Sequence, residues 1–219
     1  MFGWNMSKER ASAVEAAPTP GREPALLGAG CGLVEGTLVA TGAGWHPVET
    51  LRAGDQVLTF DGGMQTVTAL IRDELWGGLG PCPEALWPLL VQPEVIGNRN
   101  EMLVMPNQGI LVESESVTDQ WGDPYAVVPG AALEVLDDVE RVEPYGSVEV
   151  ILPVFEQDQM IFADNGALVF CESHWGVGAG VLPKFNNTSG YSMLPLHMAV
   201  RLLEVAALPP VLDCDLATA

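Results

Sequence analysis

Residues 30–61 constrain the fold more than any other stretch, because short apolar runs alternate there with glycine turns. An apolar and β-branched pair stands at Leu38 and Val39, a turn follows at Gly42–Gly44, and a second run occupies Val57–Phe60. Runs this short, bounded by glycine, are typical of β-strands. The stretch therefore predicts a β-rich start.

Cys31 stands directly after Gly30, and this pair suggests a chemistry. A thiol in that position can attack the carbonyl carbon of its own preceding peptide bond and convert an amide into a thioester. Because Gly30 has no side chain, nothing crowds the attack. Cys31 is therefore a candidate catalytic nucleophile.

The same stretch resembles the N-terminal block of the Hint (hedgehog/intein) family, in its short bacterial branch. The residues that match the family pattern are Cys31, Gly36, Thr37, Val39, Ala40, Thr41, Val48, Glu49, Leu51, Gly54, Asp55 and Val57. A weaker resemblance continues through residues 102–112 and 148–173. It implies an all-β, Hint-like fold and, in active members, autocatalytic peptide-bond cleavage that needs no cofactor.

The sequence departs from the family where active members carry histidines. Gln108 takes the place of the histidine that helps to expel the amine, and Leu152 and Asp158 stand where related sequences have two more. Met105 replaces a serine or threonine. Glutamine donates hydrogen bonds but cannot serve as a general acid near neutral pH. These replacements predict that Cys31 is vestigial and that Gln108 and Asp158 mark lost catalytic positions.

None of the three histidines aligns with these positions; they are His46, His174 and His197. His174 follows Cys171 at the spacing of a Cys-x-x-His metal pair, but no second pair accompanies it. A zinc site needs about four such ligands. The sequence therefore predicts no metal.

The composition of the chain limits the classes of partner that it can bind. The chain of 219 residues is 48% hydrophobic, which suits one sizeable core, and its formal charge is -20. Such a charge repels nucleic acids and anionic membranes. Four cysteines without a Cys-x-x-Cys pair favour a reducing compartment. No signal peptide or apolar run of about 18 residues is present, which favours a cytoplasmic protein without membrane insertion.

The rest of the chain yields coarser predictions. Residues 66–71 form a strand, residues 101–112 a strand, turn and strand, and residues 131–136 a short helical turn. Residues 75–92, rich in proline and glycine, form an irregular insertion that either covers the core or presents an exposed patch. Residues 192–208 predict a helix that buries Leu196, Val200, Leu203 and Ala207.

The predicted organisation is an N-terminal arm and linker at 1–29, a Hint-like domain at 30–175, and a loop, helix and tail at 176–219. Phe2, Trp4 and Met6 alternate with small or polar residues, so an extended arm would present all three on one side. The arm either docks on a partner or folds back onto its own domain.

Two functions follow from these observations. The first is a non-catalytic Hint domain that serves as a structural or protein-binding subunit of a larger assembly. The second is a self-processing domain that cleaves at Gly30–Cys31 through a thioester. The absence of the expected histidines supports the first, and the intact Cys31 block supports the second. No small-molecule substrate is evident for either.

Overall fold

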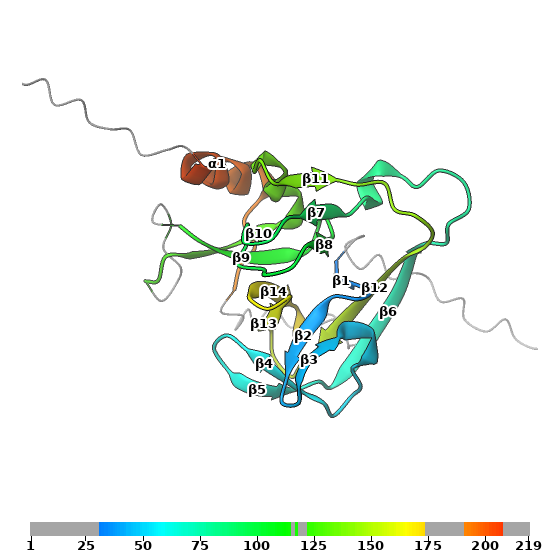
Figure 1. Ribbon diagram of the computed structural model, residues 1–219. Helices are drawn as coiled ribbons and strands as arrows, with labels where there is room; N and C mark the ends of the chain where they lie inside the picture. The colour runs from blue at the N-terminus through cyan, green and yellow to red at the C-terminus, as the bar shows by residue number, and fades with distance from the viewer. Residues whose placement is uncertain (1–30, 115–116, 118–121, 174–190, 208–219) are drawn as a thin grey trace, which may run out of the picture.

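The computed structural model describes residues 31–114, 117, 122–173 and 191–207. Within these residues most of the regular structure is β-strand, with one α-helix near the C-terminal end (Figure 1). The expected all-β fold with a C-terminal helix is confirmed. Phe2, Trp4, Met6 and His174 lie outside the described residues, so the docking of the arm stays a prediction.

Eight of the described strands form the largest sheet. Its strand order is β10-β9-β14-β13-β2-β4-β5, with β3 added beside β2, and neighbouring strands are antiparallel. The bounds are β2 Leu38–Thr41, β3 Gly44–Pro47, β4 Gln56–Thr59, β5 Gly63–Thr66, β9 Gly109–Glu113, β10 Tyr125–Pro129, β13 Gln159–Ala163 and β14 Ala167–Cys171.

Two three-stranded antiparallel sheets complete the described strands. One has the order β1-β12-β6 and the other β11-β7-β8. Their bounds are β1 Leu33–Val34, β6 Ala69–Trp76, β7 Leu89–Val91, β8 Met102–Val104, β11 Val139–Arg141 and β12 Val148–Val154. Leu33, two residues after Cys31, pairs with Ile151, so β1 holds this part of the chain against β12.

Burial explains why these segments are strands. In β4, Val57 and Thr59 are buried whereas Gln56 and Leu58 are exposed, which is the alternation expected of a strand with one face toward solvent. β12 is instead buried along almost its whole length, as its continuous apolar run Val150–Val154 requires. The core therefore lies on both sides of β12.

The Gly54–Asp55 pair of the N-terminal block makes a turn between β4 and the preceding loop. Gly54 has a φ of +99°, a conformation that residues with a side chain rarely adopt. The Asp55 carboxylate accepts a hydrogen bond from the Arg52 backbone N–H at 2.8 Å, and the Asp55 carbonyl accepts one from Val67 at 2.9 Å. This pair is therefore structural.

Three short 3-10 helices connect described strands: η1 Val48–Thr50, η2 Glu84–Leu86 and η3 Gly130–Val135. The last agrees with the predicted helical turn at 131–136. The predicted strand, turn and strand at 101–112 is also present, as β8 and β9.

Two sequence predictions around residue 75 are wrong. β6 begins at Ala69 rather than at residue 66 and continues to Trp76, because its backbone pairs with β12 as far as Val148. The segment 75–92, predicted to be an irregular insertion, accordingly begins with the last residues of β6, contains η2 and includes β7 near its end. Propensity alone could not show these pairings, because the partner strands are far away in the sequence.

Part of this segment covers the core and part is exposed. Trp76, Leu86 and Trp87 pack against a buried cluster of Cys82, Met105, Val148 and Val150. Leu79, at the tip, is 91% exposed. Part of the segment therefore covers the core, and the exposed patch stays a prediction.

Helix α1, Leu196–Ala207, packs against η3 and β10 at one end of the molecule (Figure 1). It begins four residues after the predicted start at residue 192. Its buried side chains include Ala199, Leu202 and Leu203, but Leu196 is 49% exposed, so the predicted burial of Leu196 is wrong. The contact face is centred on Ala199, and the first turn projects into solvent.

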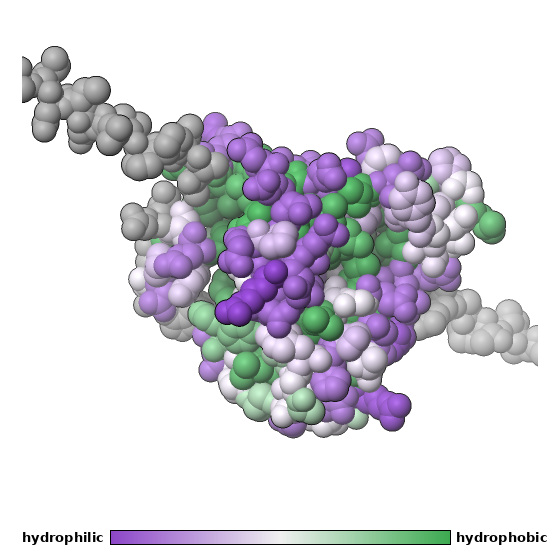
Figure 2. All heavy atoms as spheres, viewed as in Figure 1, coloured by the Kyte–Doolittle hydropathy of each residue, from purple (hydrophilic) through white to green (hydrophobic). Residues whose placement is uncertain are grey.

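The surface mixes hydrophilic and hydrophobic side chains (Figure 2). Hydrophobic groups lie over β4 and β5, where Leu58, Phe60 and Met64 are 38%, 36% and 41% exposed. The described residues contain arginines but no lysine, because the two lysines of the chain, Lys8 and Lys184, lie outside them. No described helix is long and apolar enough to cross a membrane.

Candidate functional site

Cys31 lies at the point where the chain joins β12. Gly32 follows it with a φ of +123°, and a Cβ added there would come within 3.1 Å of the Val150 Cβ atom. Glycine is needed at this position for both reasons. Cys31 is partly exposed and carries a free thiol.

Gln108 connects this junction to two strands of the large sheet. It lies in the turn between β8 and β9 and is only 2% exposed. Its Oε1 accepts a hydrogen bond from the Gly32 N–H at 2.8 Å, and its Nε2 donates to the Phe170 carbonyl at 2.7 Å and to the Gly109 carbonyl at 3.2 Å. Both amide N–H groups are thus used by backbone carbonyls.

Gly109 makes room for this contact. A Cβ at Gly109 would lie 2.9 Å from the Phe170 Cβ and 3.0 Å from the Val127 Cγ1. Because such distances are shorter than carbon atoms tolerate, only glycine lets β9 approach β14 this closely. The close approach allows the Gln108 amide to reach the Phe170 carbonyl.

The surroundings keep the thiol of Cys31 protonated. Burial raises its pKa from the ordinary value of 9.0 to about 12; the negative charge of Glu172 adds to the rise, and the Gly32 backbone N–H opposes it. A rise of about three pH units lowers the thiolate fraction at neutral pH about 1,000-fold. Cys31 is therefore a weak nucleophile in the folded domain.

Cys171, the last residue of β14, belongs to the same site. It is fully buried, and burial raises the pKa of its thiol well above the ordinary value of 9.0. Negative charge on Cys31, Asp158 or Glu172 raises the pKa further. The sequence prediction did not include Cys171 in this site; its position thirteen residues after Asp158 gave no signal of the contact.

The two other positions of replaced histidines have structural contacts. The Oδ1 atom of Asp158 accepts hydrogen bonds from the Ser173 backbone N–H and hydroxyl, each at 2.6 Å. This carboxylate holds the chain after β14 against the start of β13. Leu152 is 4% exposed and belongs to the main core, and Met105 is fully buried in the smaller cluster around Cys82.

The two described histidines occupy other elements. His46 is exposed on β3 and His197 is exposed on α1. The described residues contain no group of three or more histidine, cysteine or acidic side chains that could hold a metal ion.

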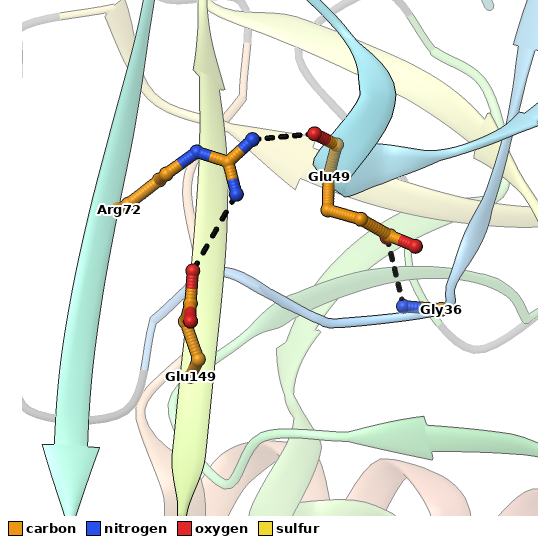
Figure 3. A network of polar contacts seen from close by, with 4 residues as sticks. All are labelled: Gly36, Glu49, Arg72 and Glu149. Carbon is orange, nitrogen blue, oxygen red and sulfur yellow. Dashed lines mark hydrogen bonds and ion pairs between the residues drawn. The ribbon is translucent and has the colours of Figure 1, made fainter.

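Glu49, a matching residue of the N-terminal block, ties three segments together (Figure 3). Its carboxylate accepts a hydrogen bond from the Gly36 N–H at 2.9 Å, and its backbone carbonyl accepts one from the Arg72 guanidinium. Arg72 also pairs with Glu149 on β12 at 3.4 Å. Glu49 therefore positions the turn before β2.

The N-terminal junction and the strands that surround it correspond to one known domain type. A sequence model of the Hint domain matches residues 31–176. The chain belongs to the Hint-domain family. The match begins at Cys31 and includes Gln108, Asp158 and Cys171, so the site described above lies within the Hint domain.

Solved intein structures resemble this Hint domain at low identity. The solution structure of a bacterial intein-like domain from Clostridium thermocellum is 14% identical, with a TM-score of 0.42, and covers 64% of this chain and 97% of that chain. The crystal structure of the MchDnaB-1 intein is 13% identical, with a TM-score of 0.37, and covers 62% and 98% respectively. No curated protein matches the chain.

Proposed function

We propose that this Hint domain no longer processes itself and serves as a protein-binding subunit. The observation that carries the proposal is the Gln108 amide, because both of its N–H groups are donated to the Gly109 and Phe170 carbonyls. A side chain in this state has no hydrogen left for a scissile peptide, and an amide cannot release a proton near neutral pH.

Cleavage at Gly30–Cys31 has two requirements. The sulfur of Cys31 must attack the Gly30 carbonyl carbon as a thiolate, and the departing nitrogen must receive a proton as its bond to carbon breaks. The raised pKa of Cys31 removes most of the thiolate. Loss of a positioned acid or base commonly costs a further 100-fold to 10,000-fold in rate. The small thiolate fraction of Cys31 and the lack of a positioned acid together support the proposal that the chain is not cleaved.

Exposed apolar side chains support the binding role. Leu58 is exposed on β4, Phe60 directly follows that strand, and Met64 lies opposite Leu58 on β5. An apolar group on a strongly acidic surface favours contact with another protein. The arm residues Phe2, Trp4 and Met6 supply further apolar contacts in the proposal, and the charge of -20 disfavours nucleic acid.

Intact-mass spectrometry tests the loss of processing. The purified chain, kept for a day with hydroxylamine or a thiol, is expected to stay a single species of 23.3 kDa. Gln108→His is expected to behave in the same way, because Leu152 and Asp158 remain. A fragment that begins at Cys31 and disappears in Cys31→Ala would contradict the proposal and favour self-processing.

Self-processing is the second candidate, favoured by one observation. Cys31 is retained at the first position of the domain match and is partly exposed. If this function is correct, hydroxylamine should trap the thioester and give cleavage at Gly30–Cys31 that depends on Cys31.

A further inference from the structure

Cys31 and Cys171 share one hydrogen-bonded amide. Gln108 bonds the N–H of Gly32, which directly follows Cys31, and the carbonyl of Phe170, which directly precedes Cys171. Consecutive Cα atoms are only about 3.8 Å apart. The single side chain of Gln108 therefore brings the backbones on either side of the two cysteines together.

The sheets bring the same two segments together. β1, which begins two residues after Cys31, is hydrogen-bonded to β12, and β12 packs against β14, which ends at Cys171. The thiols are also close enough for a charge on Cys31 to raise the pKa of Cys171. Both are free thiols, separated by 139 intervening residues of sequence.

We propose that Cys31 and Cys171 form a reversible disulfide, which makes the start of the Hint domain a redox-sensitive modification site. The proposal does not depend on whether the domain processes itself. An oxidised chain remains intact, and its Cys31 sulfur can no longer attack the Gly30 carbonyl.

The difference in exposure sets the order of the reaction. Partly exposed Cys31 attacks an oxidised low-molecular-weight disulfide such as oxidised glutathione, forms a mixed disulfide and releases one glutathione thiolate. Buried Cys171 then attacks the Cys31 sulfur and releases the second glutathione thiolate. Two electrons pass to glutathione, and the two protons that the cysteines lose protonate the released thiolates.

The protonated state of the thiols predicts a slow reaction with a marked pH dependence. Because only the thiolate attacks, the initial rate at Cys31 should rise about tenfold per pH unit between pH 7 and 9, well below its pKa of about 12. An exposed free cysteine would begin to level off near its own pKa of 8.5 or so.

The full chain with Cys82→Ala and Cys214→Ala tests the proposal, because only the two cysteines of interest then remain. Incubated at pH 8.5 in buffers of increasing oxidised-to-reduced glutathione ratio, it should lose about 2 Da. After an acid quench and unfolding, neither cysteine should then react with an alkylating reagent. Peptide mapping should join the segments that contain Cys31 and Cys171, and dithiothreitol should reverse the change.

Two single variants identify the roles. Cys171→Ala should leave Cys31 as a stable glutathione adduct, and Cys31→Ala should leave Cys171 unmodified. Two results for the chain that retains both cysteines would show that the proposal is wrong. One is a stable glutathione adduct on Cys31 without a joined peptide. The other is that both thiols can still be alkylated, after unfolding, in samples from the most oxidising buffer. The mapping of that chain decides the question even if Cys171→Ala does not fold.

Discussion

Gln108 is the residue whose contacts bear most directly on the choice between a structural and a catalytic role. The resemblance predicts a lost catalytic position here, and the Gln108 amide is buried and bonds one backbone N–H and two backbone carbonyls. Buried polar groups are costly when they lose their partners. The side chain therefore stabilises the junction between β1, β9 and β14.

Gln108→Leu tests this role, because leucine is close in size and bonds to nothing. It leaves the Gly32 N–H and the Phe170 carbonyl unpaired, at about 1–3 kcal/mol for each buried group. We expect chemical denaturation to show a lower free energy of unfolding by that order. Gln157→Leu, at an exposed position, is the control and should change stability by less than about 0.5 kcal/mol. Equal stability of the two variants would contradict the role.

The resemblance to the Hint family predicted that Gln108 marks a lost catalytic position, but it did not predict the contacts of this side chain. Its hydrogen-bond partners Gly32 and Phe170 lie 76 and 62 residues away in the sequence. Contacts over such distances depend on how the sheets pack. The neighbourhood of Cys171 and Cys31 was missed for the same reason.

At the scale of elements, the β13–β14 hairpin depends on a close contact between two glycine backbones. A Cβ on Gly166 would lie 2.0 Å from the Gly97 carbonyl oxygen. The Arg99 N–H donates to the Asp164 carbonyl of the same hairpin turn at 2.9 Å. The loop before β8 is therefore seated directly on this turn.

Gly166→Ala should disrupt the contact between this loop and the hairpin turn, because the Gly97 carbonyl oxygen belongs to the backbone and cannot rotate away from the added Cβ. We expect a loss of stability of about 1–3 kcal/mol, the usual cost of overpacking. Gly42→Ala is the matched control, since its added Cβ meets only the flexible end of Met64, at 3.1 Å. Thermal melting of the two variants measures the difference, and a loss in Gly42→Ala as large as that in Gly166→Ala would show that the backbone contact is not limiting.

Elements with a local signal were predicted well. The strands on either side of Pro106 follow from apolar runs that a turn delimits. The ends of β6 and the exposed first turn of α1 were predicted wrongly, because pairing with β12 and packing on η3 decide them. A period of 3.6 residues locates a helix, but the neighbouring elements determine which turns are covered.

At the scale of the whole molecule, the proposal is that the domain determines the stability of the chain and that the N-terminal arm binds the partner protein. Phe2, Trp4 and Met6 would each contribute roughly 1.5–3 kcal/mol when fully buried against a partner. The described residues form hydrophobic clusters of their own.

Deletion of residues 1–6 separates the two roles. We expect the melting temperature of the isolated chain to stay nearly unchanged, whereas co-purification with the native partner weakens. A chain with Phe2, Trp4 and Met6 replaced by serine keeps the length of the arm and should behave like the deletion. If the melting temperature instead falls by several degrees and association persists, the arm packs on its own domain.

The lack of lysine among the described residues has a practical consequence for handling the protein. Reagents that couple to primary amines react with lysine and with the amino terminus, and here the lysines are Lys8 and Lys184, both outside the described residues. A dye, a sensor surface or a resin attached in this way would be bound to residues other than the described ones, and the described residues would stay chemically unmodified. For the same reason, an amine-directed cross-linker will not attach to any described residue, and carboxyl-directed coupling to the acidic side chains is the chemistry to choose for them.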